Sequence, residues 1–353
     1  MKKDICIEGY ATGSWQLATG KIPVNSTIRS KFPSIRFAPD VVAHRISVSG
    51  IRSSVSGLPY LTIMLLFITL AFSSCEDVIQ VNLGKENLNL IGVEARITTM
   101  DQPAVYLYKT LHVDQDVDYP GISGAVVTIS DNANPVHEMT LVELDSKKGL
   151  YLVPPRQSYR GIPGREYSLK IVTGGVTLIA KEKLMEVAPI DSIQVKPSMR
   201  GDKMFLGIFT YGLEPPGLGS YYKWDIYVND SLIQSADRLA IASDELVDGN
   251  YISGLEIFTD FHDPNKPQDR LLDLNDTIMV KQNSISEFDY NFYSQMINQN
   301  ATGSLFSIPP ANIKSNFTSS DGKPVLGLFV ASDVSTSNKV VVDQTIEDQL
   351  VKP

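Results

Sequence analysis

The sequence is poor in cysteine, and beyond residue 75 it is poor in positive charge. Among its 353 residues the only cysteines are Cys6 and Cys75. If the chain is cleaved before Cys75, a single thiol remains, so an internal disulfide framework is excluded and packing must stabilise the fold. Hydrophobic residues make up 43% of the chain and charged residues 20%. This composition is typical of a globular protein and excludes a disordered polymer or a multi-span membrane protein.

The charge is divided unevenly along the chain. Residues 1–75 hold eight Lys or Arg and three acids, a net charge of +5, whereas the rest of the chain holds 23 basic and 37 acidic residues, a net charge of −14. A body this acidic repels phosphate backbones. We therefore expect no nucleic-acid partner.

The apolar stretch LTIMLLFITLAF, residues 61–72, is too short to cross a membrane. A transmembrane helix needs about 20 apolar residues, whereas the apolar part of a secretory signal peptide has about 7 to 15. Arg45 and Arg52 precede the stretch, and two serines and Cys75 follow it. This order predicts a signal peptide over residues 58–75.

The end of the stretch, FSSC, resembles the lipobox of bacterial lipoproteins, in which a cysteine takes lipid on its sulfur and becomes the mature N-terminus. Phe72 stands where that pattern prefers Leu. The resemblance implies that Cys75 is acylated, with palmitate as a label, and that several acyl chains attach the protein to the outer membrane. Each buried methylene of such a chain contributes about 0.8 kcal/mol. The alternatives are a secreted soluble protein and a buried strand with an incidental cysteine.

Two short segments flank the leader. Glu76 and Asp77 resemble the acidic signal that directs some lipoproteins of the Bacteroidetes to the cell surface. Residues 1–57 lack steady periodicity, and we expect them to reflect a start site assigned too far upstream. An authentic extra cytoplasmic segment is the alternative.

From Leu88 onward the mature chain alternates apolar and polar residues. Val93, Ala95 and Ile97 would face one side of a half-buried strand. Such strands are predicted at residues 88–98, 104–111, 124–130, 139–144, 167–172, 204–211, 221–228, 254–260, 276–281 and 325–331. Turn-forming residues separate them, which is typical of a sandwich.

One segment follows a helical period instead. Ile285, Phe288, Phe292, Tyr293 and Met296 recur at helical intervals after a capping box of Ser284 and Glu287. A helix is predicted over 286–298, with its aromatic stripe in the core. The predicted fold is thus all-β, mainly β with one helix, in two β-sandwich domains: residues 76–190, immunoglobulin-like, and residues 191–353.

Several segments stand in an order that resembles domain-of-unknown-function family 4249, a set of Bacteroidetes lipoproteins. They include SSCEDVIQVNL, IGVEARIT, SGAVVTISD, GREYSLKI, YYKWDIYVND, SDELVDG, GSLFSIPPANIKSN and PVLGLFVAS. The resemblance covers about residues 75–342. Because members of the family are often encoded beside TonB-dependent outer-membrane receptors, it implies an accessory role in capture or uptake.

The sequence offers no catalytic constellation that we can assign. It has no G-x-S-x-G, and His137-Glu138 lacks the second histidine of a zincin. We expect no enzyme, no cofactor and no metal. A hydrolase is the less favoured alternative, and it would need a pocket that gathers Asp260, His262 and another titratable group. Asp260 and His262 also belong to an acidic cluster with Asp263 and Asp269, which we expect to hold no metal.

Two loops are the candidate contact regions for a ligand or partner. The first is the acidic loop with Asp114, Asp116, Asp118 and Tyr119, which lacks the Gly and Glu that an EF-hand needs. The second is the loop that carries Pro309, Pro310 and Asn312. Loops at the ends of sandwiches commonly carry recognition.

Three tripeptides match the D-[ST]-aliphatic pattern of O-glycosylation in Bacteroidetes, with Ser192, Ser231 and Thr277 as acceptors. Together these features predict an outer-membrane or surface-exposed lipoprotein with a non-catalytic binding role, accessory to a TonB-dependent receptor. A structural or assembly lipoprotein without a small ligand is the alternative.

Overall fold

Strands dominate the described part of the chain. The computed structural model describes residues 90–110, 119–233, 238–261, 270–300 and 313–350, all within a compact unit that includes Asn87–Pro353. The predicted signal peptide and Cys75 lie outside the described residues. Among the helices that are described, none is both long and apolar enough to cross a membrane.

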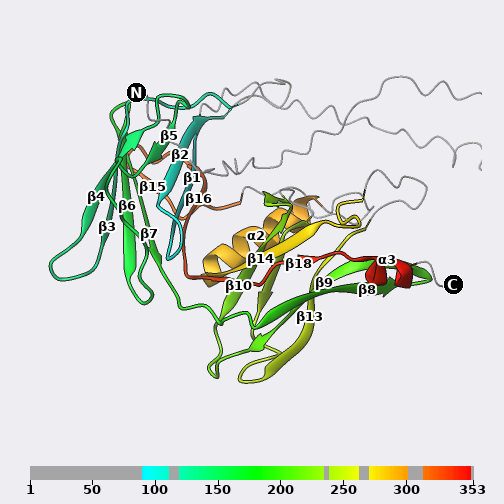
Figure 1. Ribbon diagram of the computed structural model, residues 1–353. Coiled ribbons are helices and arrows are strands. Elements are labelled where there is room, and N and C mark those ends of the chain that lie inside the picture. The colour runs from blue at the N-terminus through cyan, green and yellow to red at the C-terminus, as the bar shows by residue number, and fades with distance from the viewer. Residues whose placement is uncertain (1–89, 111–118, 234–237, 262–269, 301–312, 351–353) are drawn as a thin grey trace, which may run out of the picture. The chain divides into compact units, whose positions relative to one another are not determined.

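The first sheet has nine strands and is built mainly from the N-terminal half (Figure 1). Its strands are β1 (Ile91–Thr98), β2 (Ala104–Lys109), β3 (Val126–Asp131), β4 (Glu138–Glu143), β5 (Leu150–Leu152), β6 (Glu166–Thr173), β7 (Val176–Lys183), β15 (Thr318–Ser319) and β16 (Leu326–Ser332). The spatial order is β15-β7-β6-β3-β4-β5-β2-β1-β16. The first and last parts of the sheet share one core, and a parallel bridge joins Met185, just beyond β7, to Ser332 in β16. The sheet is therefore folded over its own apolar face.

The period of two predicted this core correctly. Val93 and Ile97 are fully buried and Ala95 is nearly so. Tyr167 and Leu169 lie inward in the same way on β6. Because alternate side chains of a strand point to opposite faces, one buried face follows directly from the sequence pattern.

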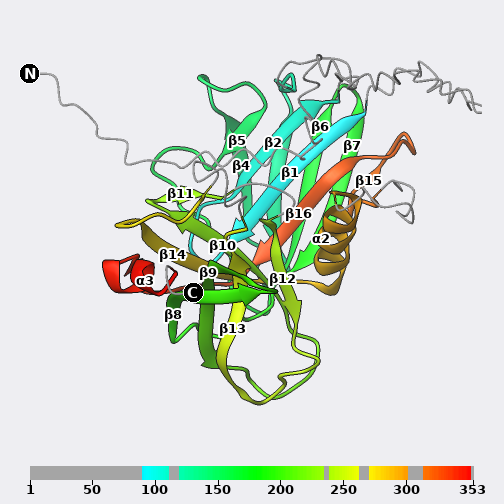
Figure 2. The ribbon, with the colours of Figure 1, turned by 90° about the vertical axis from the view of Figure 1, so that its right-hand side faces the viewer.

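Two further sheets follow along the chain and enclose a second core (Figures 1 and 2). We call these two sheets the second sandwich and the folded nine-stranded sheet the first sandwich. The smaller sheet contains β8 (Ser192–Arg200), β9 (Lys203–Leu213) and β13 (Tyr251–Thr259). The larger contains β10 (Tyr221–Val228), β11 (Ser231–Leu232), β12 (Ala240–Ser243), β14 (Thr277–Ile285), β17 (Val334–Thr336) and β18 (Val340–Val341), and the short helix α3 (Gln344–Leu350) ends the described chain. Ile208 and Trp224 come from facing sheets and pack in one cluster. The predicted all-β, sandwich-like fold with one long helix is confirmed.

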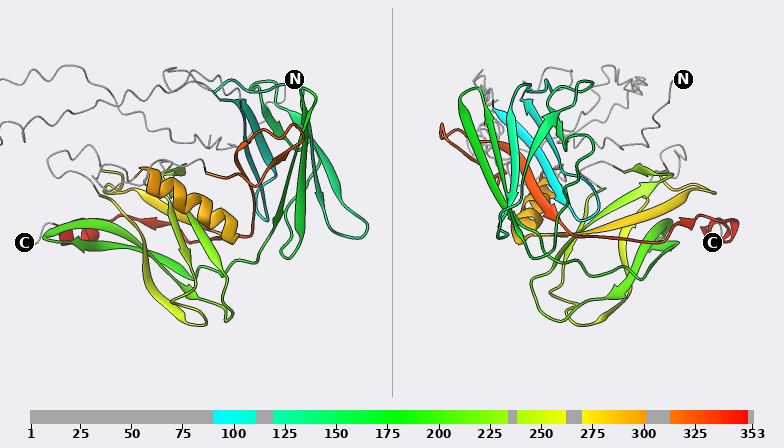
Figure 3. Two further views of the ribbon diagram at one scale, coloured as in Figure 1. Left: turned by 180° about the vertical axis from the view of Figure 1, so that it is seen from behind. Right: turned by 60° about the vertical axis from the view of Figure 1, so that its left-hand side comes forward.

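The long helix α2 (Glu287–Asn300) covers part of the larger sheet (Figure 3). Phe292 and Tyr293 are buried as the aromatic stripe predicts, whereas Phe288 is 40% exposed. The helix also explains an exception to the strand pattern: Lys223 points away from the sandwich core but is buried, because its ammonium lies over the ring of Tyr293.

The predicted capping box is shifted by two residues. Ser286 accepts a hydrogen bond from the Asp289 N–H at 3.2 Å, and Asp289 accepts one from the Ser286 N–H at 3.4 Å. Ser284 remains in β14, where its hydroxyl donates to the carbonyl of Met185 and accepts from the Asp333 N–H. Both serines satisfy the spacing of a capping box, so the buried contacts of Ser284 decide between them.

Some strands were missed, and two depart from the chain order. β7 was missed although Leu178 and Ala180 point inward, because the charged run Lys181-Glu182-Lys183 hides the alternation. β8 was missed because Pro197 and Ser198 interrupt its apolar pattern. β15 and β16 come from the second half of the sequence and pair with β7 and β1 in the first sheet. No local pattern indicates such long-range pairing.

Candidate functional site

Most of the predicted site residues lie outside the described residues. These are Cys75, Asp114, Asp116, Asp118, Pro309, Pro310 and Asn312, together with His262, Asp263 and Asp269 of the acidic cluster. Their roles stay predictions.

Tyr119 is the described residue of the predicted acidic loop. Its ring lies 5.0 Å from that of Tyr108, and its carbonyl accepts a hydrogen bond from the hydroxyl of Tyr106 at 3.1 Å. Tyr119 therefore packs on strand β2 rather than projecting freely. Asp260, from the acidic cluster, is fully buried and accepts hydrogen bonds from the backbone N–H groups of Leu271 and Leu272.

The three predicted glycosylation residues all lie at the ends of strands. Ser231 begins β11 and is exposed, whereas Ser192 and Thr277 begin β8 and β14 and are half-buried. Exposure makes Ser231 the most accessible of the three hydroxyls.

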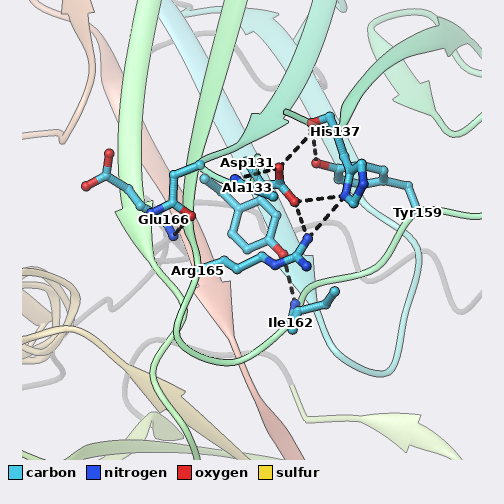
Figure 4. A network of polar contacts seen from close by, with 9 residues as sticks. Asp131, Ala133, His137, Tyr159, Ile162, Arg165 and Glu166 are labelled. Atoms are coloured by element: carbon cyan, nitrogen blue, oxygen red, sulfur yellow. Dashed lines mark hydrogen bonds and ion pairs between the residues drawn. The ribbon is translucent and has the colours of Figure 1, made fainter. Parts of the chain in front are cut away.

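A network of polar side chains surrounds the turn between β3 and β4 (Figure 4). The carboxylate of Asp131 accepts hydrogen bonds from the N–H groups of Ala133 at 3.2 Å and His137 at 2.9 Å. The Arg165 guanidinium lies 2.5 Å from the same carboxylate, and the His137 ring nitrogen Nδ1 lies 3.3 Å from it. The Tyr159 hydroxyl donates to the carbonyl of His137.

This network fixes the turn. Burial raises the pKa of the Asp131 carboxyl, but the N–H groups of His137 and Ala133 and the Arg165 guanidinium outweigh burial and hold that pKa below its usual value. Asp131 is therefore ionised at neutral pH and fully engaged by its partners. The Arg165 guanidinium and the N–H groups of Ala133 and His137 are all directed at the Asp131 carboxylate, so we interpret the network as a clamp on the turn.

Two further carboxyl groups, those of Glu182 and Asp289, are buried where α2 meets the first sheet. Glu182 accepts a hydrogen bond from the Asn316 amide at 3.2 Å, and Asp289 is fully buried. Burial raises the pKa of both carboxyls, and the Glu182 charge raises that of Asp289 further. The Asp289 Oδ1 atom has no hydrogen-bond partner among the described residues. Two like charges in one buried space favour sharing of a proton.

A pocket lies between the sheets of the second sandwich. At its wall the Tyr222 hydroxyl donates to Glu214 at 2.7 Å, the Trp224 indole donates to Gln282 at 2.8 Å, and Gln282 donates to the Ala188 carbonyl. The cavity volume is about 20 Å³, which is room for about one water molecule. A space of this size suits a water molecule rather than an organic ligand.

Two loop segments that contribute Leu213, Glu214 and Val247 to the lining of this pocket also expose large apolar side chains. We call residues 213–220 and 244–251 together the leucine tip; they connect β9 to β10 and β12 to β13, at the lower end of Figure 2. Leu246 is 95% exposed and Leu218 is 69% exposed. Leu213 and Tyr251, each 54% exposed, stand opposite each other on β9 and β13, so these two side chains lie on the same face of the sheet.

Buried acids hold the leucine tip in shape. The carboxylate of Asp244, 1% exposed, accepts hydrogen bonds from the N–H groups of Gly219 at 3.2 Å and Ser220 at 2.9 Å. Asp248 accepts one from the Gly217 N–H. The two segments are also joined by a backbone hydrogen bond from Glu214 to the residue 250 carbonyl. The leucines are thus exposed on an ordered support.

The leucine tip is not among the contact regions predicted from the sequence, although the sequence holds a signal for it. The segments SDELVDG and EPPGLGS each place a leucine among turn formers and acids. Turns of this composition lie at the surface, so their leucines can be assigned there.

Among the described residues, no three His, Cys, Asp or Glu side chains are grouped so as to hold a metal ion. The fold and these sites define an all-β protein whose described polar clusters stabilise turns and junctions. Residues 76–338, about three quarters of the chain, match the family described as "Domain of unknown function (DUF4249)". The chain belongs to this family, as the order of its segments predicted. No curated protein matches the chain.

Proposed function

We propose that this protein is a lipoprotein of the outer membrane, attached through Cys75, that binds a partner without catalysis and assists a TonB-dependent receptor in capture or uptake. The signal-like stretch before Cys75 supports the membrane attachment. The leucine tip supports the binding role, because apolar side chains on an ordered loop end are typical of contact surfaces.

The observation that carries the proposal is the exposure of Leu218 and Leu246. The charged clusters that could instead support chemistry are engaged in the fold. Asp131 holds a turn, and Asp260 accepts two backbone N–H groups. A hydrolase would need such groups to face a substrate-sized pocket.

Two measurements on cells that produce the full chain test the proposal. Labelled palmitate should enter the wild-type protein and be absent from the Cys75→Ala variant. Affinity isolation of the tagged wild-type protein in detergent should then recover an outer-membrane receptor. Label that persists in the variant contradicts acylation at Cys75, and isolation without a receptor favours a structural or assembly role in the envelope.

A further inference from the structure

We propose that the leucine tip docks into a protein partner that offers an apolar groove with Lys or Arg side chains along its rim. The inference rests on the proposed binding function and states the chemistry of the partner.

The direction of the two leucines is set before any partner arrives. Leu218 lies between Gly217 and Gly219, whose φ angles are 125° and 113°. These are conformations that other residues rarely adopt. Asp244 and Asp248 bind the N–H groups of this turn and place it beside Leu246. A surface that is ordered in the free protein loses little conformational entropy on binding, which favours affinity.

The charge around the leucines indicates the rim of the partner. The segments 213–220 and 244–251 contain four acids and no Lys, Arg or His. Glu214 and Asp244 are buried within the fold, but Glu245 is exposed and Asp248 is half-buried at the surface. Charges across an interface are arranged to be complementary, so a partner of the leucine tip needs positive side chains around its apolar groove.

The negative charge of the tip argues against two other partners, a lipid surface and a second copy of the chain. Segments that insert into lipid surfaces carry Lys or Arg for the anionic headgroups, and the leucine tip carries only acids. A second copy of the chain would bring Glu245 of one tip against that of the other, and like charges repel.

The small apolar area of the leucine tip suits a partner that is held in the same membrane. The tip exposes four large apolar side chains, whereas a stable complex uses about 20 to 30 residues on each partner. Two proteins held on one membrane meet at a high effective concentration, so a small contact can suffice.

Site-specific photo-crosslinking in living cells tests this inference. A benzophenone amino acid replaces Leu246 in the full-length, acylated protein, and the matched control carries it at Val136, which is 60% exposed on the β3–β4 turn. We expect an adduct with another protein from position 246 and not from position 136. The crosslinked peptide should be apolar and flanked by Lys or Arg. Adding Glu245→Lys should lower the adduct yield at least fivefold.

Four outcomes would overturn the inference: no protein adduct from position 246, an equal adduct from position 136, an adduct with a second copy, or a yield that Glu245→Lys leaves unchanged. Vesicles of phosphatidylethanolamine and phosphatidylglycerol address the lipid alternative, since Leu246-dependent binding of the unacylated Cys75→Ala variant would also overturn it. If the receptor is still recovered while position 246 gives no adduct, the inference fails and the proposed function stands. If palmitate labelling persists without Cys75, the proposed function fails independently of the crosslink.

Discussion

Two loop ends of this molecule are ordered by the same kind of hydrogen bond but are surrounded by different side chains. At the β3–β4 turn, the buried carboxylate of Asp131 binds two backbone N–H groups, and at the leucine tip the buried carboxylate of Asp244 does the same. Around Asp131 stand Arg165 and His137, whereas around Asp244 stand exposed leucines. The buried carboxylate that orders a loop end therefore does not determine which side chains the loop end exposes.

The difference shows which end is suited to binding. At the β3–β4 turn Arg165 and His137 contact Asp131 itself, so these polar groups are engaged within the fold. At the leucine tip the acids are used to hold the loops, and the apolar side chains remain exposed to solvent. The leucine tip exposes four large apolar side chains, whereas Val136 is the large apolar side chain exposed on the β3–β4 turn. The tip therefore gains more free energy by meeting a partner.

The largest expected effect comes from removing the charged clamp. Asp131→Ala leaves the N–H groups of Ala133 and His137 without an acceptor and removes the partner of Arg165. We expect the free energy of unfolding to fall by about 3 kcal/mol, below the upper range for a buried ion pair because the Arg165 side chain is 27% exposed. Urea denaturation measures this loss. Lys181→Ala, which breaks an exposed pair with Glu166, is the control and should cost less than about 0.5 kcal/mol; equal effects would refute the clamp.

The clamp at the leucine tip, in which Asp244 binds backbone N–H groups, should matter less. Asp244→Ala removes the acceptor of two N–H groups but leaves no charged partner behind, so we expect a loss of about 2 kcal/mol. Hydrogen exchange should become faster at Gly219 and Ser220, while Glu245→Ala, on an exposed neighbour, leaves both amides unchanged. Unaltered exchange in Asp244→Ala would show that the backbone hydrogen bonds alone order the tip.

Opposite pH dependences should distinguish the acids of the two regions. The pKa of Asp131 is lowered, so its charge stabilises the fold above about pH 4 and this contribution is lost as the pH falls through the folded-state pKa. Burial raises the pKa of Glu214, so its contribution is most favourable at low pH and declines as the pH rises above about 4.3.

Two variants measure these slopes. The deficit of Asp131→Asn relative to wild type should be largest near neutral pH and shrink in acid, whereas Glu214→Gln should gain on wild type as the pH rises. Unfolding followed from acid to neutral pH provides the comparison. Slopes of the same sign for both variants would contradict the assigned shifts.

The sequence predicts the faces of this fold better than its connections. The period of two correctly placed Val93, Ala95 and Ile97 in the core, because alternation is a local property of a strand. The parallel pairing of β16 with β1 joins residues more than 200 positions apart, and nothing local encodes it. The helix α2 was predicted within two residues at each end, but the choice of Ser286 over Ser284 as its cap depends on tertiary contacts.

The candidate site was harder to predict for a related reason. The acids Asp131, Asp244 and Asp260 all look like solvated surface residues in the sequence, yet each is buried and binds backbone N–H groups. Whether an aspartate lies on the surface or supports a turn depends on how the chain folds back toward it. The exposure of Leu246 is the converse case, since a leucine alone indicates a core residue and only the turn formers and acids around it indicate the surface.

The smallest effect on stability should come from the leucines themselves. This result would separate the binding role of the leucines from the role of the acids that order the loops. Leu218→Ser together with Leu246→Ser removes side chains that are mostly in water already, so the free energy of unfolding should change by less than about 0.5 kcal/mol for each substitution. Recovery of the receptor in detergent should nevertheless fall at least tenfold, while Val126→Ser with Val136→Ser, which are 57% and 60% exposed on the first sandwich, should leave recovery unchanged. A marked loss of stability would mean that the leucines pack against the fold. Full recovery would mean that the partner meets another surface, and then the contrast between the two loop ends would concern folding alone.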